Sequence, residues 1–217
     1  MNPEDLEERI LLERDGLLAI DKPPGLPTSG LSLDDPDCLQ HALIERHGDM
    51  VWAVHQIDAD TSGVNLFVTE KRLVKEFKRQ MESPTARKRY LAVVHGAPNW
   101  EQKTVRAPIG IVNERNLGVH PEGKSAHSEF VLRSRGVDAA VVEARIFTGR
   151  THQIRIHLAH LGHPLMGEEW YRTPPCTEHP RQALHGWKME LETLEIVAPI
   201  PEDLLELMRG EGLSLES

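Results

Sequence analysis

Short apolar runs separated by turn residues recur along this chain. One of them, Val64 to Val68, directly follows a polar cluster, His55-Gln-Ile-Asp-Ala-Asp-Thr-Ser-Gly63. Runs of this length bounded by glycine, proline or aspartate are typical of β-strands. The pattern predicts strands at residues 10–12, 17–20, 51–54, 64–68, 90–94, 104–107, 128–132, 139–146 and 183–191.

Fewer segments show the 3.6-residue period of a helix. Residues 71–82 carry Val74, Phe77 and Met81 at helical spacing, and their bases fall largely off that apolar stripe. Helices are also predicted at residues 37–47, 151–161 and 201–209, with glycine ending the first two. Many strands with few helices between them favour an α+β fold, in which helices flank a mixed, largely antiparallel sheet.

Three segments are predicted to be irregular. Asp21-Lys-Pro-Pro-Gly25 should form a stiff loop, because proline fixes the backbone and donates no hydrogen bond. Thr148-Gly-Arg150 is typical of a turn. Residues 163–182 form a loop of the length at which loops are usually functional. The polar cluster 55–63 directly precedes a predicted strand, and loops at strand ends often hold catalytic residues.

Charge is unevenly distributed along the 217 residues. The net charge of -9 argues at first against a protein that binds nucleic acid, since phosphates need cations. The acids concentrate near the two ends of the chain, however, and residues 70–90 hold eight bases against three acids. A basic face on an acidic protein is one interpretation, and a solvated helix face is the plainer one.

The chain has the size of one sizeable domain, which we expect to span residues 1–217. Its only cysteines, Cys38 and Cys176, do not suggest a disulfide framework, so a reducing cytoplasm fits best. The acidic N-terminus is not typical of a signal peptide. Because no apolar run is long enough to span a bilayer, a membrane partner is not expected.

Two carboxylates of the polar cluster could carry chemistry. Asp60 precedes Thr61, Ser62 and Gly63, a set that suits a turn in which side-chain oxygens accept backbone N–H groups. Asp58 lies nearer the strand. It is either a carboxylate that stabilises the backbone or a catalytic one, and the spacing leaves both interpretations open.

A second polar cluster begins at Thr148 and continues into the helix predicted at residues 151–161. Arg155 follows the apolar Ile154, so its guanidinium should emerge at the edge of the core, where a charge needs a carboxylate partner. A structural salt bridge is the plainer interpretation of that arginine. Metal binding is less favoured than packed, hydrogen-bonded histidines, since no His-Glu-x-x-His arrangement joins His152, His157, His160 and His163.

Five segments, in order along the chain, resemble the RluA family of RNA pseudouridine synthases. The cluster 55–63 is similar to the family's His-Arg-Leu-Asp-x-x-Thr-Ser-Gly signature, and Asp21 to Gly25 resembles its N-terminal loop. Lys88-Arg-Tyr-Leu-Ala-Val-Val-His-Gly resembles its tyrosine-bearing strand. Gly149 to Gly167 resembles its Gly-Arg-Thr-His-Gln-Ile-Arg-x-His helix, and Arg181-Gln-Ala-Leu-His its late strand.

The resemblance implies an isomerase that converts uridine in rRNA or tRNA to pseudouridine without a cofactor or metal, on the pseudouridine synthase fold. It implies that Asp58 is the catalytic aspartate, Tyr90 the tyrosine that stacks on the base, and Arg155 the arginine that pairs with the aspartate. The target nucleotide must leave its stack to reach such a pocket. The residues expected to contact RNA are His55, Gln56, Lys71, Arg72, Lys88 and Arg150.

The chain departs from the family pattern at two positions. Gln56 stands where the family has an arginine that takes part in RNA contacts, so substrate handling is affected rather than chemistry. Glu168 follows Gly167 where the family favours aspartate. Since only about 20 residues precede the Asp21 loop, we expect no N-terminal accessory RNA-binding domain, and we expect a monomer.

Three classes of function are therefore considered. An RNA pseudouridine synthase is favoured by Asp58, Tyr90 and Arg155 together. A catalytically degenerate RNA-binding relative is suggested by Gln56 and the acidic balance. A metal hydrolase would depend on the histidine cluster.

Overall fold

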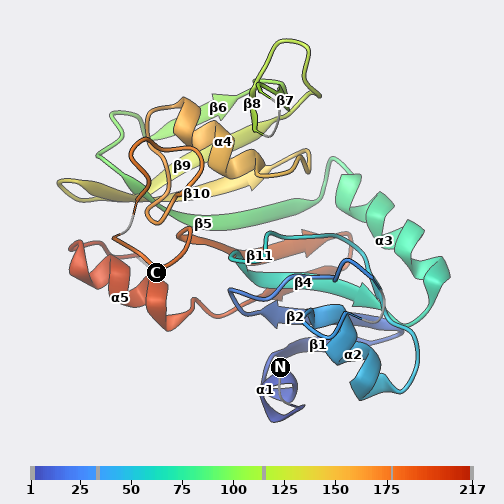
Figure 1. Ribbon diagram of the computed structural model, residues 1–217. Helices are drawn as coiled ribbons and strands as arrows, with labels where there is room; N and C mark the ends of the chain where they lie inside the picture. The colour runs from blue at the N-terminus through green and yellow to red at the C-terminus, as the bar shows by residue number, and fades with distance from the viewer. Residues whose placement is uncertain (1–2, 33–34, 114–115, 177, 216–217) are drawn as a thin grey trace. The chain divides into compact units, whose positions relative to one another are not determined.

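The computed structural model describes residues 3–32, 35–113, 116–176 and 178–215. The chain forms two compact units, the first made of residues 1–87 and 186–199 and the second of residues 88–185 and 200–217. Both units combine strands with helices packed on them, so the predicted α+β class is confirmed (Figure 1). Among the described residues, no helix has both the length and the apolar content that crossing a bilayer requires.

The first unit is built on the strand order β1-β2-β4-β11, with β3 paired to β4 and β12 paired to β11. The pairings β1–β2, β2–β4, β3–β4 and β11–β12 are antiparallel. Its elements are α1 (Pro3–Glu8), β1 (Ile10–Arg14), β2 (Leu17–Lys22), α2 (Leu39–His47), β3 (Trp52–Ala53), β4 (Ser62–Val68), α3 (Lys71–Glu82), most of β11 (Leu184–Leu191) and β12 (Leu194–Val197).

The sheet of the first unit is buried on both faces. Successive residues of a strand point to opposite faces. Leu18 belongs to an apolar cluster with Leu43 of α2, whereas its neighbour Leu17 belongs to another cluster with Met81 of α3. Because both faces are covered, all seven residues of β4 are buried, which explains its nearly unbroken apolar run. The polar cluster before β4 is thus anchored to a rigid strand.

The second unit has the strand order β5-β10-β9-β6 and a separate ribbon of β7 and β8. The helix α4 packs on this sheet, with Ile154 and Leu158 in one cluster with Phe130 and Ala144 (Figure 1). Its elements are β5 (Arg87–His95), β6 (Gln102–Val105), β7 (Ile109–Ile111), β8 (Leu117–Val119), β9 (Ser128–Arg135), β10 (Ala139–Ile146), α4 (Gln153–His160) and α5 (Glu202–Gly210).

The predicted strands and helices are confirmed, but several ends differ. The loop predicted to start at Asp21 starts at Pro23, because Asp21 and Lys22 still pair with β4. The strand predicted at residues 51–54 is limited to β3. The helix predicted from residue 151 begins at Gln153, since the residue before it, His152, has the left-handed φ of 54°.

Four elements were not predicted: α1, β7, β8 and β12. Both β7 and β8 carry a central glycine. Glycine has a low strand propensity, so the residue types there do not predict a strand. The strand β12 has only four residues and is held by its pairing with β11. Strand pairing therefore decided β7, β8 and β12.

Candidate active site

Asp58 lies at the start of a turn that leads directly into β4. The backbone N–H of Thr61 donates to the carbonyl of Asp58 at 3.0 Å, which closes the turn. Asp58 is half-buried and Asp60 is exposed, so the two carboxylates have different surroundings. Asp60 is a turn residue, as predicted. Ser62 and Gly63 were predicted to belong to the turn, which is wrong, because both are already part of β4.

A fully buried lysine holds this turn against the loop that follows β2. The ammonium group of Lys22 donates to the carbonyl of Ala59 at 2.6 Å, and to those of Pro23 at 2.8 Å and Leu26 at 2.6 Å. A buried ammonium without such acceptors would be costly. The residue after Asp58 is therefore tied to two carbonyls of the proline-containing loop through one cation.

A second brace acts on the residue before Asp58. The hydroxyl of Thr28 lies 3.3 Å from both the carbonyl and the N–H of Ile57, and it donates to Oδ1 of Asn65 at 2.8 Å. Thr28 and Asn65 are both buried. The turn that carries Asp58 is consequently fixed on both sides, which is the support that a positioned carboxylate needs.

His55 and Gln56 were predicted to contact RNA, and the structure gives each a partner within the first unit. Nε2 of His55 accepts the backbone N–H of Leu66 at 3.2 Å, which ties the segment to β4. Gln56 is exposed, and its Nε2 donates to the hydroxyl of Ser29 at 2.7 Å. His55 thus supports the loop, while Gln56 presents its side chain at the surface.

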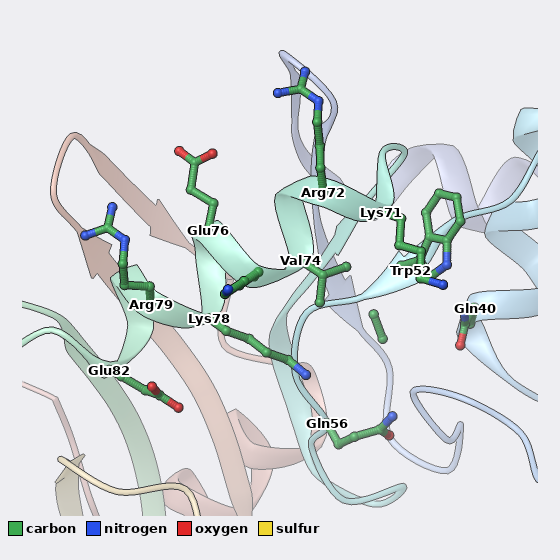
Figure 2. A pocket seen from close by; sticks show the side chains of 12 residues that line it. Gln40, Trp52, Gln56, Lys71, Arg72, Val74, Glu76, Lys78, Arg79 and Glu82 are labelled. Carbon is green, nitrogen blue, oxygen red and sulfur yellow. The ribbon is translucent and has the colours of Figure 1, made fainter.

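A cavity of about 1010 Å³ adjoins Gln56. Its lining includes Gln56, Trp52 and the polar side of α3, with the predicted RNA-contacting residues Lys71 and Arg72 (Figure 2). Lys71 and Arg72 are exposed. The cavity thus has cations on its wall, and one of its lining residues, Gln56, precedes Asp58 by two positions in the sequence.

In the second unit, Tyr90 and Lys88 lie on β5 and both are buried. Tyr90 is 9% exposed and belongs to the apolar cluster under α4, which fixes the position of its ring. Lys88 is only 7% exposed, whereas Lys71 is exposed, and the contact of Lys88 with RNA stays a prediction.

Arg155 forms a buried, two-point ion pair with Glu168. Its Nε donates to one carboxylate oxygen at 2.9 Å and its Nη2 to the other at 2.7 Å. Glu168 is fully buried and Arg155 nearly so. The structural salt bridge expected from the sequence is confirmed, and its partner is the residue at which the chain departs from the family pattern. The pairing of Arg155 with Asp58, which the resemblance implies, stays a prediction.

Glu168 also accepts the backbone N–H groups of Trp170 at 3.0 Å and Tyr171 at 3.3 Å. Burial by itself raises the pKa of Glu168, but the hydrogen bonds and charge of Arg155, with these two N–H groups, outweigh it and hold that pKa below its ordinary value. The guanidinium carbon of Arg155 lies 5.1 Å from the Trp170 ring centre and 5.3 Å from that of Tyr171. Arg155 is thus a fixed cation bordered by aromatic rings.

The segment before α4 is organised by Gln153, which the sequence argument had not singled out. Its Oε1 accepts from the hydroxyl of Thr148 at 2.7 Å and from the N–H of Arg150 at 3.0 Å, while its Nε2 donates to the carbonyl of His127 and the hydroxyl of Ser128, both at 2.9 Å. The side-chain amide of Gln153 thus accepts two hydrogen bonds and donates two. It shapes the turn from which Arg150, a predicted RNA contact, extends.

Two histidines of the second polar cluster, His152 and His157, have hydrogen-bond partners within the protein. Nδ1 of His157 lies 2.9 Å from the hydroxyl of Ser128, and Nε2 lies 3.0 Å from the carbonyl of Ala107. Burial lowers the pKa of His157. Nδ1 of His152 lies 2.7 Å from the Tyr171 hydroxyl. With both ring nitrogens of His157 occupied, that side chain offers no lone pair to a metal ion.

Within the described ranges, one group of three potential metal ligands was found: His95, Cys176 and Glu178. The guanidinium of Arg172 lies 3.0 Å from Nε2 of His95. A guanidinium only donates, so it occupies the lone pair of that nitrogen and opposes a second cation. The arrangement does not favour a metal centre.

The residues that support Asp58, namely Lys22, Thr28 and Asn65, were missed as functional by the sequence argument. The sequence did contain a signal for a buried Lys22. A lysine between an apolar strand and two prolines has few ways to place its charge in water. Thr28 and Asn65 had no such signal, since their roles depend on contacts between residues 29 and 37 positions apart in the sequence.

Residues 16–160 match the family described as RNA pseudouridylate synthase. The ribosomal large subunit pseudouridine synthase D of Nitrosomonas europaea is 33% identical in an alignment 225 positions long, which covers 93% of this chain and 64% of that protein. The ribosomal large subunit pseudouridine synthase C of Pasteurella multocida is 31% identical in an alignment 223 positions long, which covers 94% of this chain and 68% of that protein. This chain therefore spans less than two thirds of the first relative and just over two thirds of the second.

A solved structure, Human RNA Pseudouridylate Synthase Domain Containing 4, superposes with a TM-score of 0.82 at 20% identity. The match covers 99% of this chain and 97% of the human one. At this identity the similarity shows a shared fold.

Proposed function

Because this chain belongs to the RNA pseudouridylate synthase family, we propose that it isomerises uridine in RNA to pseudouridine. The observation that carries the proposal is the turn at Asp58. Lys22 and Thr28 hold the residues on either side of Asp58, and the turn leads into the buried strand β4. So much support for one half-buried carboxylate suits a residue that must meet a reacting atom in a fixed position.

In this reaction the uracil base is detached from the ribose, turned, and rejoined through a carbon atom. Asp58 acts at the sugar, because a carboxylate beside an electron-poor sugar carbon is the group that glycosidic chemistry uses. Tyr90 provides the ring on which the base stacks. The pairing of Arg155 with the carboxylate of Asp58, which the resemblance implies, is part of this proposal. Glu168 is a positioning residue, since it sets the plane and direction of the Arg155 guanidinium.

The proposed substrate is ribosomal RNA, with transfer RNA as the alternative. It is supported by the names of the two relatives, both of which refer to the large ribosomal subunit. We propose that both units belong to one catalytic domain, because the family match at residues 16–160 runs through parts of each. A cytoplasmic location is supported by two cysteines that are buried and unpaired. The expectation of a monomer stays a prediction.

The test compares two neighbouring carboxylates. Purified wild type, Asp58→Asn and Asp60→Asn are incubated with ribosomal RNA transcripts lacking modifications, and pseudouridine is measured by mass spectrometry of nucleosides. Removing the acting carboxylate should lower the rate by roughly a hundredfold or more. Asp60→Asn makes the same change of charge and shape as Asp58→Asn. Because the side chain of Asp60 is exposed in the turn, we expect nearly full activity of this variant. Equal rates for Asp58→Asn and wild type would refute the role of Asp58.

A binding protein without activity is the second candidate, and Gln56 is the observation that favours it. That candidate predicts RNA binding by wild-type protein with no pseudouridine formed on ribosomal or transfer RNA. Pseudouridine formation by the wild type excludes it. The assay uses RNA in substrate amounts and an active relative as the positive control. Absence of pseudouridine with the wild type is then conclusive.

A further inference from the structure

The hollow beside Gln56 has a strongly basic wall. Five bases and two acids of α3 line it. The two arginines have carboxylate partners: Arg72 lies 2.7 Å from Glu70, and Arg79 lies 3.9 Å from Glu192. The three lysines of the wall have no carboxylate within 4 Å among the described residues; they are Lys71, Lys75 and Lys78.

These three lysines form a line along the helix. Their spacing of four and then three residues places them on one ridge of α3, about 10 Å long, and all three are exposed. Figure 2 shows the ammonium group of Lys78 directed toward Gln56 across the hollow. A line of uncompensated cations along one wall fits a polyanion chain better than a single small anion.

The hollow also contains an aromatic surface. Trp52 of β3 lines it close to the start of α3, next to Lys71 in Figure 2. The ring is half-buried, because one side packs against the core cluster beneath α3. A fixed tryptophan bordered by lysines is the combination on which proteins stack unpaired bases while binding the phosphates.

We propose that this groove binds single-stranded RNA next to the target uridine, with the bases stacked on Trp52 and the phosphates held by Lys71, Lys75 and Lys78. The proposal rests on the function proposed above and deepens it. Gln56 lines the groove and precedes Asp58 by two residues, so a strand in the groove leads to the turn at Asp58. A duplex does not fit this role, since its bases are stacked on each other and offer no free face to Trp52.

The experiment measures binding of a fluorescein-labelled dodecamer of uridylate by anisotropy, between 0.05 and 1 M salt as roughly the useful range. The variants are the triple change Lys71→Gln, Lys75→Gln, Lys78→Gln and the single change Trp52→Leu. The matched control removes three exposed bases that do not line the groove, through Arg14→Gln, Lys103→Gln and Arg209→Gln. Thermal unfolding of each variant verifies folding, and Trp52→Phe keeps an aromatic face if Trp52→Leu is unstable.

The two kinds of variant should differ in their salt dependence. Loss of three phosphate contacts should reduce the slope of log affinity against log salt by about 2. The ratio of wild-type affinity to variant affinity should therefore be about a hundredfold larger at 0.1 M than at 1 M salt. Trp52→Leu should weaken binding roughly 5-fold to 150-fold at every salt concentration and leave the slope unchanged, because stacking releases no counterions. The control triple variant should bind like wild type.

Unchanged affinity and slope in the lysine variant would overturn the proposal, and so would equal losses in the lysine variant and the control. Activity separates this result from the proposed function. If wild type forms pseudouridine and the lysine variant does so with unchanged KM, the groove is refuted and the isomerase stands. If wild type forms none but the lysine variant loses RNA binding, the groove stands and the isomerase is refuted.

Discussion

The buried pair of Arg155 and Glu168 makes the stability of the second unit sensitive to one carboxylate. Glu168→Gln keeps the size of the side chain and removes its charge, so a guanidinium that is 6% exposed loses its two-point carboxylate partner. Breaking one partner of such a pair costs about 3–5 kcal/mol, and we expect the lower value because the Gln amide oxygen still accepts one hydrogen bond. In a chain of this size that corresponds to a fall in Tm of about 6–12 °C.

The assay is thermal and urea unfolding of wild type, Glu168→Gln and Glu169→Gln. Glu169 is the adjacent residue and is exposed, so the same charge change should alter the free energy of unfolding by less than about 0.5 kcal/mol. The pKa of Glu168 is lowered by folding, so its contribution is complete above the pKa of the unfolded state, near 4.5, and is lost as pH falls through the folded value. The gap between wild type and Glu168→Gln should therefore narrow in acid. A loss below about 1 kcal/mol at pH 7, or a gap that widens in acid, would refute this reasoning.

Three further outcomes are expected. Gly63→Ala should destabilise the protein by at least about 2 kcal/mol in urea unfolding, since its φ of 107° strains an L-residue and the added Cβ would overlap the carbonyl of Gly186. Lys22→Met should lower kcat for pseudouridine formation and cost about 1–3 kcal/mol, because three carbonyls lose their donor, whereas the exposed Lys103→Met should change neither. Burial lowers the pKa of His157, so its contribution to stability is complete above about pH 6.5 and falls as the pH drops. Wild type should therefore lose Tm between about pH 7.5 and 5.5, and His157→Asn should lose less. An equal loss of Tm in the variant would contradict this role of His157.

Much of the element pattern was predictable because periodicity reflects burial directly. The strand at residues 139–146 and the helix at 71–82 have the predicted bounds, since each has a strong period and clear ends. Prediction failed where local preference is weak, as in β7 and β8 with their central glycines. It also failed at Asp21 and Lys22, because the following prolines do not prevent pairing with β4.

The sequence by itself determined the kinds of group available near the polar cluster, the salt bridge that Arg155 would need, and the family, through motifs in a fixed order. Only the tertiary structure decided the partners. It made Glu168 the counterion of Arg155 and Lys22 the clamp on the turn at Asp58. The physical reason is that periodicity reports which side chains leave water, whereas a hydrogen bond between distant segments depends on where the packed chain brings two atoms together.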